Sequence, residues 1–195
     1  MDLIRNARRW LRDERGITGL ETAIILIAFV VVATVFAFVV LTTGIFSAER
    51  GKETVFAGLQ KARGTMEVRG GIVVQATGAP LAIDTIEFQV STTAGGDPIP
   101  LDPAATSNRT VIAYRSATVV NNDMTYTTTE IVGDGDLLVE PGELFTITLD
   151  ATANTDLATL AVNERFTLEV QTPVGAVLDI TRSLPSQFDA VMQLH

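Results

Sequence analysis

The hydrophobic residues of the chain are concentrated in one long block near the N-terminus. Between Ala23 and Leu41, only Thr34 is not apolar. At about 1.5 Å per residue, this block and its flanks can cross the ~30 Å hydrocarbon core of a bilayer as a helix. The block therefore predicts a membrane-spanning helix.

Helical periodicity continues beyond the apolar block. Four apolar residues follow at i, i+4, i+7 and i+11, namely Val55, Leu59, Ala62 and Met66. This spacing predicts one helix over residues 17–68. Roughly 50 residues at ~1.5 Å each make a rod of about 75 Å, which is longer than one bilayer requires. The extra length predicts that something other than lipid contacts the helix.

Small residues recur along this helix at intervals of seven: Ala37, Gly44, Gly51 and Gly58. Residues with this spacing lie on one slowly drifting face, where the backbones of neighbouring helices can approach closely. The spacing predicts the seam of a helix bundle. The alternative is that the glycines only loosen the helix, at about 1 kcal/mol each relative to Ala.

Beyond residue 68 the hydrophobic period changes from helical to two. Ile86, Phe88 and Val90 alternate with polar residues, as in a half-buried strand. The strand candidates are 71–75, 85–90, 110–120, 126–132, 145–150, 166–171 and 176–181. Turn-rich segments separate them, as is typical of antiparallel all-β domains. Residues 69–195 are therefore predicted to form a β-sandwich, and the whole chain to be an α+β protein.

A short basic segment precedes the apolar block. The first sixteen residues carry five Arg and three acidic residues, a local charge of +2. A standard secretory signal has an apolar core of ~7–15 residues followed by an Ala-x-Ala-like site, and this chain fits neither requirement. The arginines are expected to stay on the cytoplasmic side of the membrane.

The rest of the chain is acidic. The formal net charge is -9, and from Gly70 onward sixteen acidic residues face four arginines. Such a surface repels phosphate, which disfavours nucleic-acid binding. It indicates either ordinary solubility or adaptation to concentrated salt. With no Cys, the chain can form neither a disulfide framework nor a thiolate metal site.

The turn-rich segment 133–143 clusters four carboxylates: Asp134, Asp136, Glu140 and Glu143. Carboxylate oxygens next to glycines suit a hard cation such as Ca²⁺. The match to an EF-hand loop is partial. A structural calcium site and a solvated acidic hairpin turn are therefore both open.

The chain has a single Asn-x-Ser/Thr sequon, at Asn108. It lies beside the turn-rich stretch 93–103, so an exposed Asn108 could carry a glycan. The alternative is a chance occurrence of the motif.

Catalytic motifs are missing from the sequence. The sole His is His195, and without Cys neither Ser-His nor Cys-His chemistry has its usual residues. The Gly-Gly pairs do not extend into a phosphate-binding loop. We expect a protein that is not an enzyme and requires no cofactor, so nucleotide-driven activity would belong to its partners.

The residues Arg15-Gly16-Ile17, with Glu21 four positions later and the apolar block behind them, resemble the class III leader of archaellins and, more distantly, of type IV pilins. The resemblance is close through Val40. It implies that a membrane aspartic peptidase cleaves between Gly16 and Ile17, which removes residues 1–16. Glu21 would then pair with the new amine of Ile17, in its own or a neighbouring subunit; a solvated interfacial acid is the alternative.

The resemblance also implies an immunoglobulin-like head that can hold a metal. It implies a subunit of the archaellum, the archaeal motility filament, in which N-terminal helices pack into a homopolymer or a copolymer with related archaellins. The precursor would lie in the cytoplasmic membrane, with the leader peptidase and the assembly machinery as partners, and the mature subunit in an extracellular filament. The alternatives are an adhesive type IV pilus-like subunit and a membrane-anchored extracellular β-sandwich that binds ligands.

Overall fold

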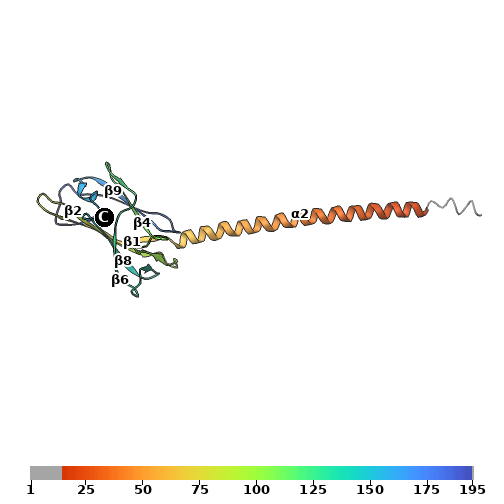
Figure 1. The fold of residues 1–195 in the computed structure, drawn as a ribbon, viewed down its shortest axis with the longest axis horizontal. Helices are drawn as coiled ribbons and strands as arrows, with labels where there is room; N and C mark the ends of the chain where they lie inside the picture. Colours follow the sequence, from red (N-terminus) through yellow and green to blue (C-terminus); the bar gives the residue numbers. More distant parts are fainter. Residues whose placement is uncertain (1–14, 195) are drawn as a thin grey trace, which may run out of the picture. The chain divides into compact units, whose positions relative to one another are not determined.

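The computed structural model describes residues 15–194, with side chains from Gly19 onward in the helix. Within this range there are one long helix and eleven β-strands (Figure 1). The chain divides into two compact units, Met1–Val55 and Phe56–His195. Most of the predicted leader, residues 1–14, lies outside the described range.

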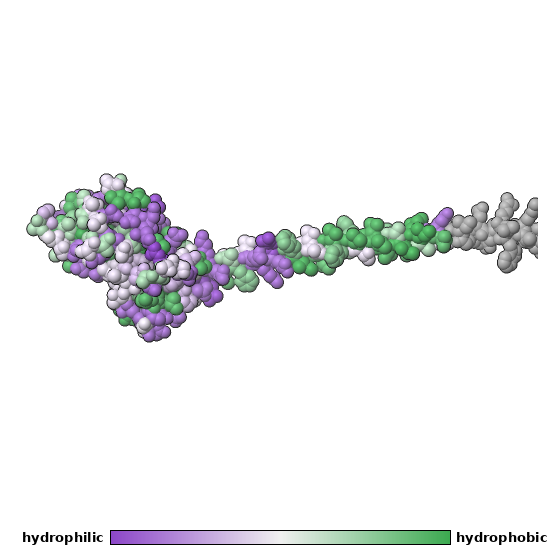
Figure 2. All heavy atoms as spheres, in the orientation of Figure 1, coloured by the Kyte–Doolittle hydropathy of each residue, from purple (hydrophilic) through white to green (hydrophobic). Residues whose placement is uncertain are grey.

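Helix α2 spans Arg15–Arg63, 49 residues. All its described side chains are exposed. Figure 2 shows an almost continuous apolar surface that gives way to charged residues near 49–53. The hydroxyl groups of Thr34, Thr42 and Thr43 donate to carbonyls three or four residues earlier, so they are satisfied inside the helix. Among the described residues, this is the one helix long and apolar enough to cross a membrane.

The helix ends earlier than the sequence predicts. Its last residue is Arg63, not Val68, and strand β1 begins at Met66. Met66 continues the helical spacing in the sequence, yet it pairs with Thr92 in the sheet and is buried in the core. Sheet pairing and burial of Met66 together outweigh the local helical pattern.

All seven predicted strand segments contain strands, with shifted ends. The longer strands are β1 Met66–Thr77, β2 Ala82–Thr92, β4 Val111–Arg115, β6 Thr127–Val132, β8 Leu144–Asp150, β9 Arg165–Gln171, β10 Leu178–Ser183 and β11 Val191–Leu194. The short ones are β3 Ile99–Pro100, β5 Val120–Asn121 and β7 Leu138–Val139, and a 3-10 turn, η1, spans Leu157–Thr159. The predicted strand 110–120 is broken because the Ser116 hydroxyl accepts from the amides of Thr118 and Val119 and forms a turn.

The strand order is that of an immunoglobulin domain. One sheet has the order β11-β1-β2-β8-β6 and a second the order β10-β9-β4-β5, while β3 and β7 pair as a separate two-stranded sheet. All these strand pairs are antiparallel. Without β11, the first sheet matches the immunoglobulin order ABED, and β10-β9-β4 matches GFC. The predicted immunoglobulin-like sandwich is confirmed, with β11 as an additional edge strand on β1.

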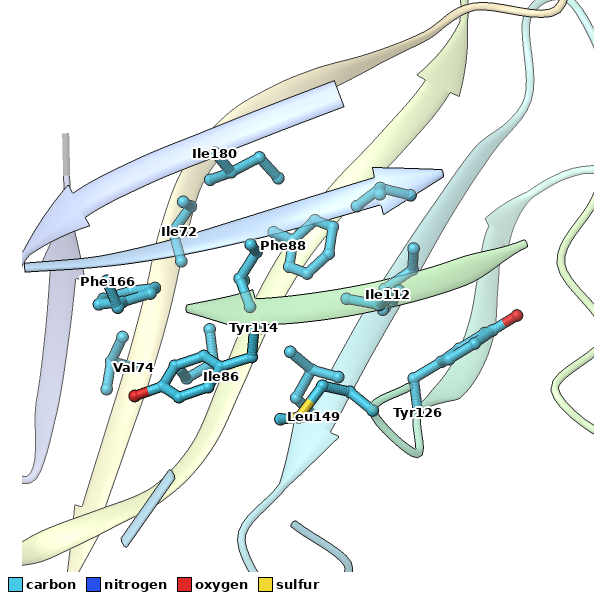
Figure 3. Packing of buried hydrophobic residues seen from close by; sticks show 14 of the residues in the cluster. Ile72, Val74, Ile86, Phe88, Ile112, Tyr114, Tyr126, Leu149, Phe166 and Ile180 are labelled. Atoms are coloured by element: carbon cyan, nitrogen blue, oxygen red, sulfur yellow. The ribbon is translucent and has the colours of Figure 1, made fainter. Parts of the chain in front are cut away.

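The core of the head lies between the two sheets (Figure 3). Phe88 and Phe145 from the five-stranded sheet meet Tyr114 and Phe166 from the other, and each is at most 1% exposed. Tyr114 lies on β4, the strand equivalent to the one that carries a buried Trp in immunoglobulin domains. Because the chain has no Cys, burial of apolar side chains stabilises the sandwich without a disulfide.

Candidate functional site

The exposed surface of helix α2 is the largest feature that the subunit leaves uncovered. Large apolar side chains point outward all around it; Phe29 is 73% exposed and Phe36 69%. An apolar surface of this extent is unfavourable in water and marks a membrane or protein contact. No described side chain between Gly19 and Arg63 is buried by the subunit itself. The covering must therefore come from lipid or from other chains.

The predicted seam residues all lie within this helix. Around Gly44, Gly51 and Gly58, no heavy atom lies within 4 Å of where a Cβ would stand. These glycines therefore make no close contact inside the subunit. The seam stays a prediction about contacts with other helices.

The predicted leader junction lies in the first turn of α2. Arg15, Gly16 and Ile17 are helical, and their side chains lie outside the described set. Glu21 is exposed and follows Ile17 by four residues, so the two positions share a helix face. Cleavage after Gly16, and pairing of Glu21 with the new amine, stay predictions.

The other end of α2 is capped by the head. Helices leave their last carbonyls without intrahelical partners. Here the amide of Asp97 donates to the Arg63 carbonyl at 2.9 Å, and the Thr172 hydroxyl donates to the Gly64 carbonyl at 3.1 Å. The Arg63 side chain bonds the Asp97 carboxylate at 2.8 Å. The last turns of the helix therefore belong structurally to the head, and no motif in the sequence predicts this junction.

Close backbone packing at this junction requires glycine. A Cβ on Gly175 would stand 1.8 Å from the Gly64 carbonyl oxygen, and one on Gly96 would stand 2.8 Å from the Arg63 carbonyl oxygen. Gly175 also donates its amide to the Thr172 hydroxyl at 2.9 Å. Any side chain at Gly175 would push the head loop off the end of the helix.

Three of the four predicted calcium ligands converge. Asp134, Glu140 and Glu143 place carboxylate oxygens within 4.8 Å of one another. Asp136 is not in this group, and its carboxylate accepts a hydrogen bond from the Leu138 amide at 2.7 Å. The Glu143 carboxylate also accepts from the Glu140 amide at 2.9 Å. The oxygen donors fit Ca²⁺, and the same bonds are those of an acidic turn.

The sequon residues differ in accessibility. Asn108 is exposed, with a positive φ of 53°. Thr110 is fully buried, and its hydroxyl donates to the Pro100 carbonyl at 2.7 Å. The side chain predicted to carry the glycan is therefore accessible in the folded head.

The pKa values of three groups in the head are shifted by contacts that belong to the fold. Burial raises the pKa of Tyr126 to about 12, and its hydroxyl donates to the Thr110 carbonyl at 2.9 Å. Burial also raises the pKa of Tyr114. The hydroxyl and amide of Thr152 hold the pKa of the Asp150 carboxyl below its ordinary value. Each shift arises from core packing or a turn.

The family follows from comparison with known proteins. Residues 16–182 match the family model of archaeal-type flagellin. The chain belongs to the archaeal-type flagellin family. It is 35% identical to the probable flagellin 2 of Archaeoglobus fulgidus, over 93% of this chain and 95% of that protein. It is 28% identical to a probable flagellin 1 of Aeropyrum pernix, over 90% and 95%.

Solved structures agree with this membership. The subunit of the archaeal flagellum of Methanospirillum hungatei strain JF1 aligns with a TM-score of 0.65 and 25% identity, over 90% of this chain and 98% of that one. The crystal structure of an archaeal flagellin from Methanocaldococcus jannaschii aligns with a TM-score of 0.54 and 15% identity, over 66% and 95%. The second likeness supports the fold alone.

Proposed function

We propose that the chain is a structural subunit of the extracellular archaeal motility filament and that helix α2 is its polymerising element. The observation that carries this proposal is the helix surface, apolar over most of its length and covered by nothing in the subunit. The family and the likeness to an archaeal flagellum support the same function. As a flagellin, the protein acts structurally rather than as an enzyme.

Assembly begins at the membrane. The apolar stretch of α2 holds the precursor in the cytoplasmic membrane, and the leader peptidase cleaves between Gly16 and Ile17; the family match begins at Gly16. The assembly machinery then moves the subunit from lipid into the growing filament. Helices of many copies, or of related archaellins, pack into its core.

Two physical effects drive and shape this polymer. Burial of apolar surface stabilises helix packing by about 25 cal/mol per Å². Contacts between different faces of identical subunits do not close into a ring under a screw rotation, so they extend into a filament. A separate membrane motor turns this filament, and the subunit itself hydrolyses no nucleotide.

The proposal includes two further features of the head, a calcium site and a glycan. Asp134, Glu140 and Glu143 would hold a structural calcium ion that braces the connection from β6 to β8, with Asp136 supporting the turn. Asn108 would carry a glycan on the exposed surface of the head. Neither feature is needed for polymerisation through the helix.

Intact-mass and N-terminal analysis of filaments sheared from cells tests the main proposal. We expect this chain in the filaments, beginning at Ile17. A chain found only in membranes and beginning at Met1 would contradict processing and polymerisation and would favour a membrane-anchored binding protein. Deletion of the coding sequence is expected to abolish swimming; loss of adhesion with normal swimming would instead indicate a pilus.

A further inference from the structure

A cavity lies beside the capped end of helix α2. Its volume is about 160 Å³. Gln60 of the helix and Gly64 just after it form one wall, Pro98 of the loop after β2 another, and Pro173 and Val174 of the loop after β9 a third. Polar side chains also line the cavity, and it is partly open to solvent. Its volume is enough for one aromatic or branched side chain.

The walls of the cavity are held by the subunit's own bonds. Thr172 is buried, and its hydroxyl joins the Gly64 carbonyl to the Gly175 amide. Asp97 is held by the Arg63 side chain and by its own amide bond to the helix end. A preformed site of this kind needs little ordering when a side chain enters it.

The cavity lies on the helix face that carries Phe56. Gln60, which lines the cavity, follows Phe56 by four residues, so the two share one face of α2. Phe56 is 63% exposed, and Val174 at the cavity is 57% exposed. A helix that contacts Phe56 would therefore also lie beside the cavity.

We propose that this cavity receives an apolar side chain from helix α2 of a second copy of the chain. This inference rests on the proposed function, in which α2 is the surface that other copies contact. The partner helix offers five large apolar side chains outside the predicted membrane block: Ile45, Phe46, Val55, Phe56 and Leu59, each at least 49% exposed. Such a contact fixes the position of each head along the α2 helix of the neighbouring subunit.

Cysteine cross-linking in filaments tests the contact, because the natural chain has no Cys. Val174→Cys is combined, one at a time, with a cysteine substitution at Ile45, Phe46, Val55, Phe56 or Leu59. We expect oxidation of intact filaments to produce a ladder of covalent oligomers for at least one pair. The matched control replaces Val174→Cys by Val162→Cys, an exposed valine before β9 rather than after it.

Filaments that assemble but yield no ladder with Val174→Cys, or an equal ladder with Val162→Cys, would overturn the inference. Absence of the natural chain from filaments would instead overturn the proposed function, and this inference with it.

A charge substitution gives a second readout. Val174→Glu is expected to lower filament yield at least tenfold while the head unfolds at the natural temperature, because position 174 is exposed in the subunit. Val162→Glu is expected to assemble normally. Normal assembly of Val174→Glu would contradict the docking.

Discussion

The helix before residue 56 and the head use similar apolar residues in opposite ways. From Gly19 to Val55 every side chain is exposed, and large apolar groups cover the surface. In the head, residues of the same types alternate with polar ones and meet between two sheets. The head can therefore complete its own core, whereas the helix needs lipid or other copies. The buried core and the uncovered apolar surface thus belong to different parts of one chain.

The largest predicted difference is between alanine substitutions at two phenylalanines, one in the core of the head and one on the helix. Phe145→Ala in the core is expected to lower the free energy of unfolding of the head by about 3–5 kcal/mol, because it leaves a cavity. Phe38→Ala on the helix, 69% exposed, is expected to change it by less than about 0.5 kcal/mol. Denaturant unfolding of the full chain in detergent, followed by near-UV circular dichroism, measures both. Equal losses would contradict the division between the regions.

A charged residue in the helix is expected to prevent filament assembly and to leave the stability of the head unchanged. Val32→Asp places a carboxylate in the apolar stretch, at a cost of about 3 kcal/mol at the centre of a membrane helix. We expect filaments to disappear from electron micrographs while the head unfolds at its natural temperature. Val162→Asp on the head is the matched control. Normal filaments with Val32→Asp would show that this surface is not buried in the polymer.

Substitutions of glycine test whether the end of the helix is fixed to the head. Gly175→Ala is expected to destabilise the head by about 1–3 kcal/mol, because its Cβ would overlap the Gly64 carbonyl oxygen. Gly51→Ala has open space around it and is expected to strengthen the helix without affecting the head. Thermal unfolding of the full chain compares them. A neutral Gly175→Ala would mean that the helix end is not locked to the head.

Ionisation of tyrosine at alkaline pH should act on the head, because both tyrosines of the chain lie there. Between pH 10 and about 12, a Tyr in the unfolded chain ionises while Tyr126 stays protonated, so stability falls as pH rises. The full loss from Tyr126 is at most about 3 kcal/mol. Tyr126→Phe is expected to reduce this loss without abolishing it, since burial also raises the pKa of Tyr114. An unchanged pH dependence in Tyr126→Phe would contradict this assignment.

The smallest effect concerns the acidic turn. At about 10 mM Ca²⁺ and an assumed dissociation constant of about 1 mM, binding would stabilise the head by about 1 kcal/mol. We expect the melting temperature of the full chain to rise with Ca²⁺ and the rise to vanish in Glu140→Gln/Glu143→Gln. Asp136→Asn is the control, since Asp136 lies outside the converging group. No response to Ca²⁺ would favour the solvated acidic turn.

Local patterns in the sequence were sufficient for the main elements. A run of apolar residues from Ala23 to Leu41 and alternation around Phe88 and Phe145 report directly on a helix surface and on strands with one buried face. Both patterns depend on residues within a few positions of one another. The fold class followed from them because helix and strand periods are local properties. The family likeness rested on the motif Arg15-Gly16-Ile17 with Glu21 before the apolar block.

Only the tertiary structure decided features made by distant residues. Met66 continues the helical spacing but joins the core opposite Thr92. Gly64 meets Gly175 from the far end of the chain and forms the junction that no motif predicts. Asp134, Glu140 and Glu143 converge without Asp136, whose carboxylate accepts a hydrogen bond from the Leu138 amide. The first two outcomes depend on contacts between separated segments, and the third depends on the conformation of the whole turn. None of the three can be derived from the local pattern alone.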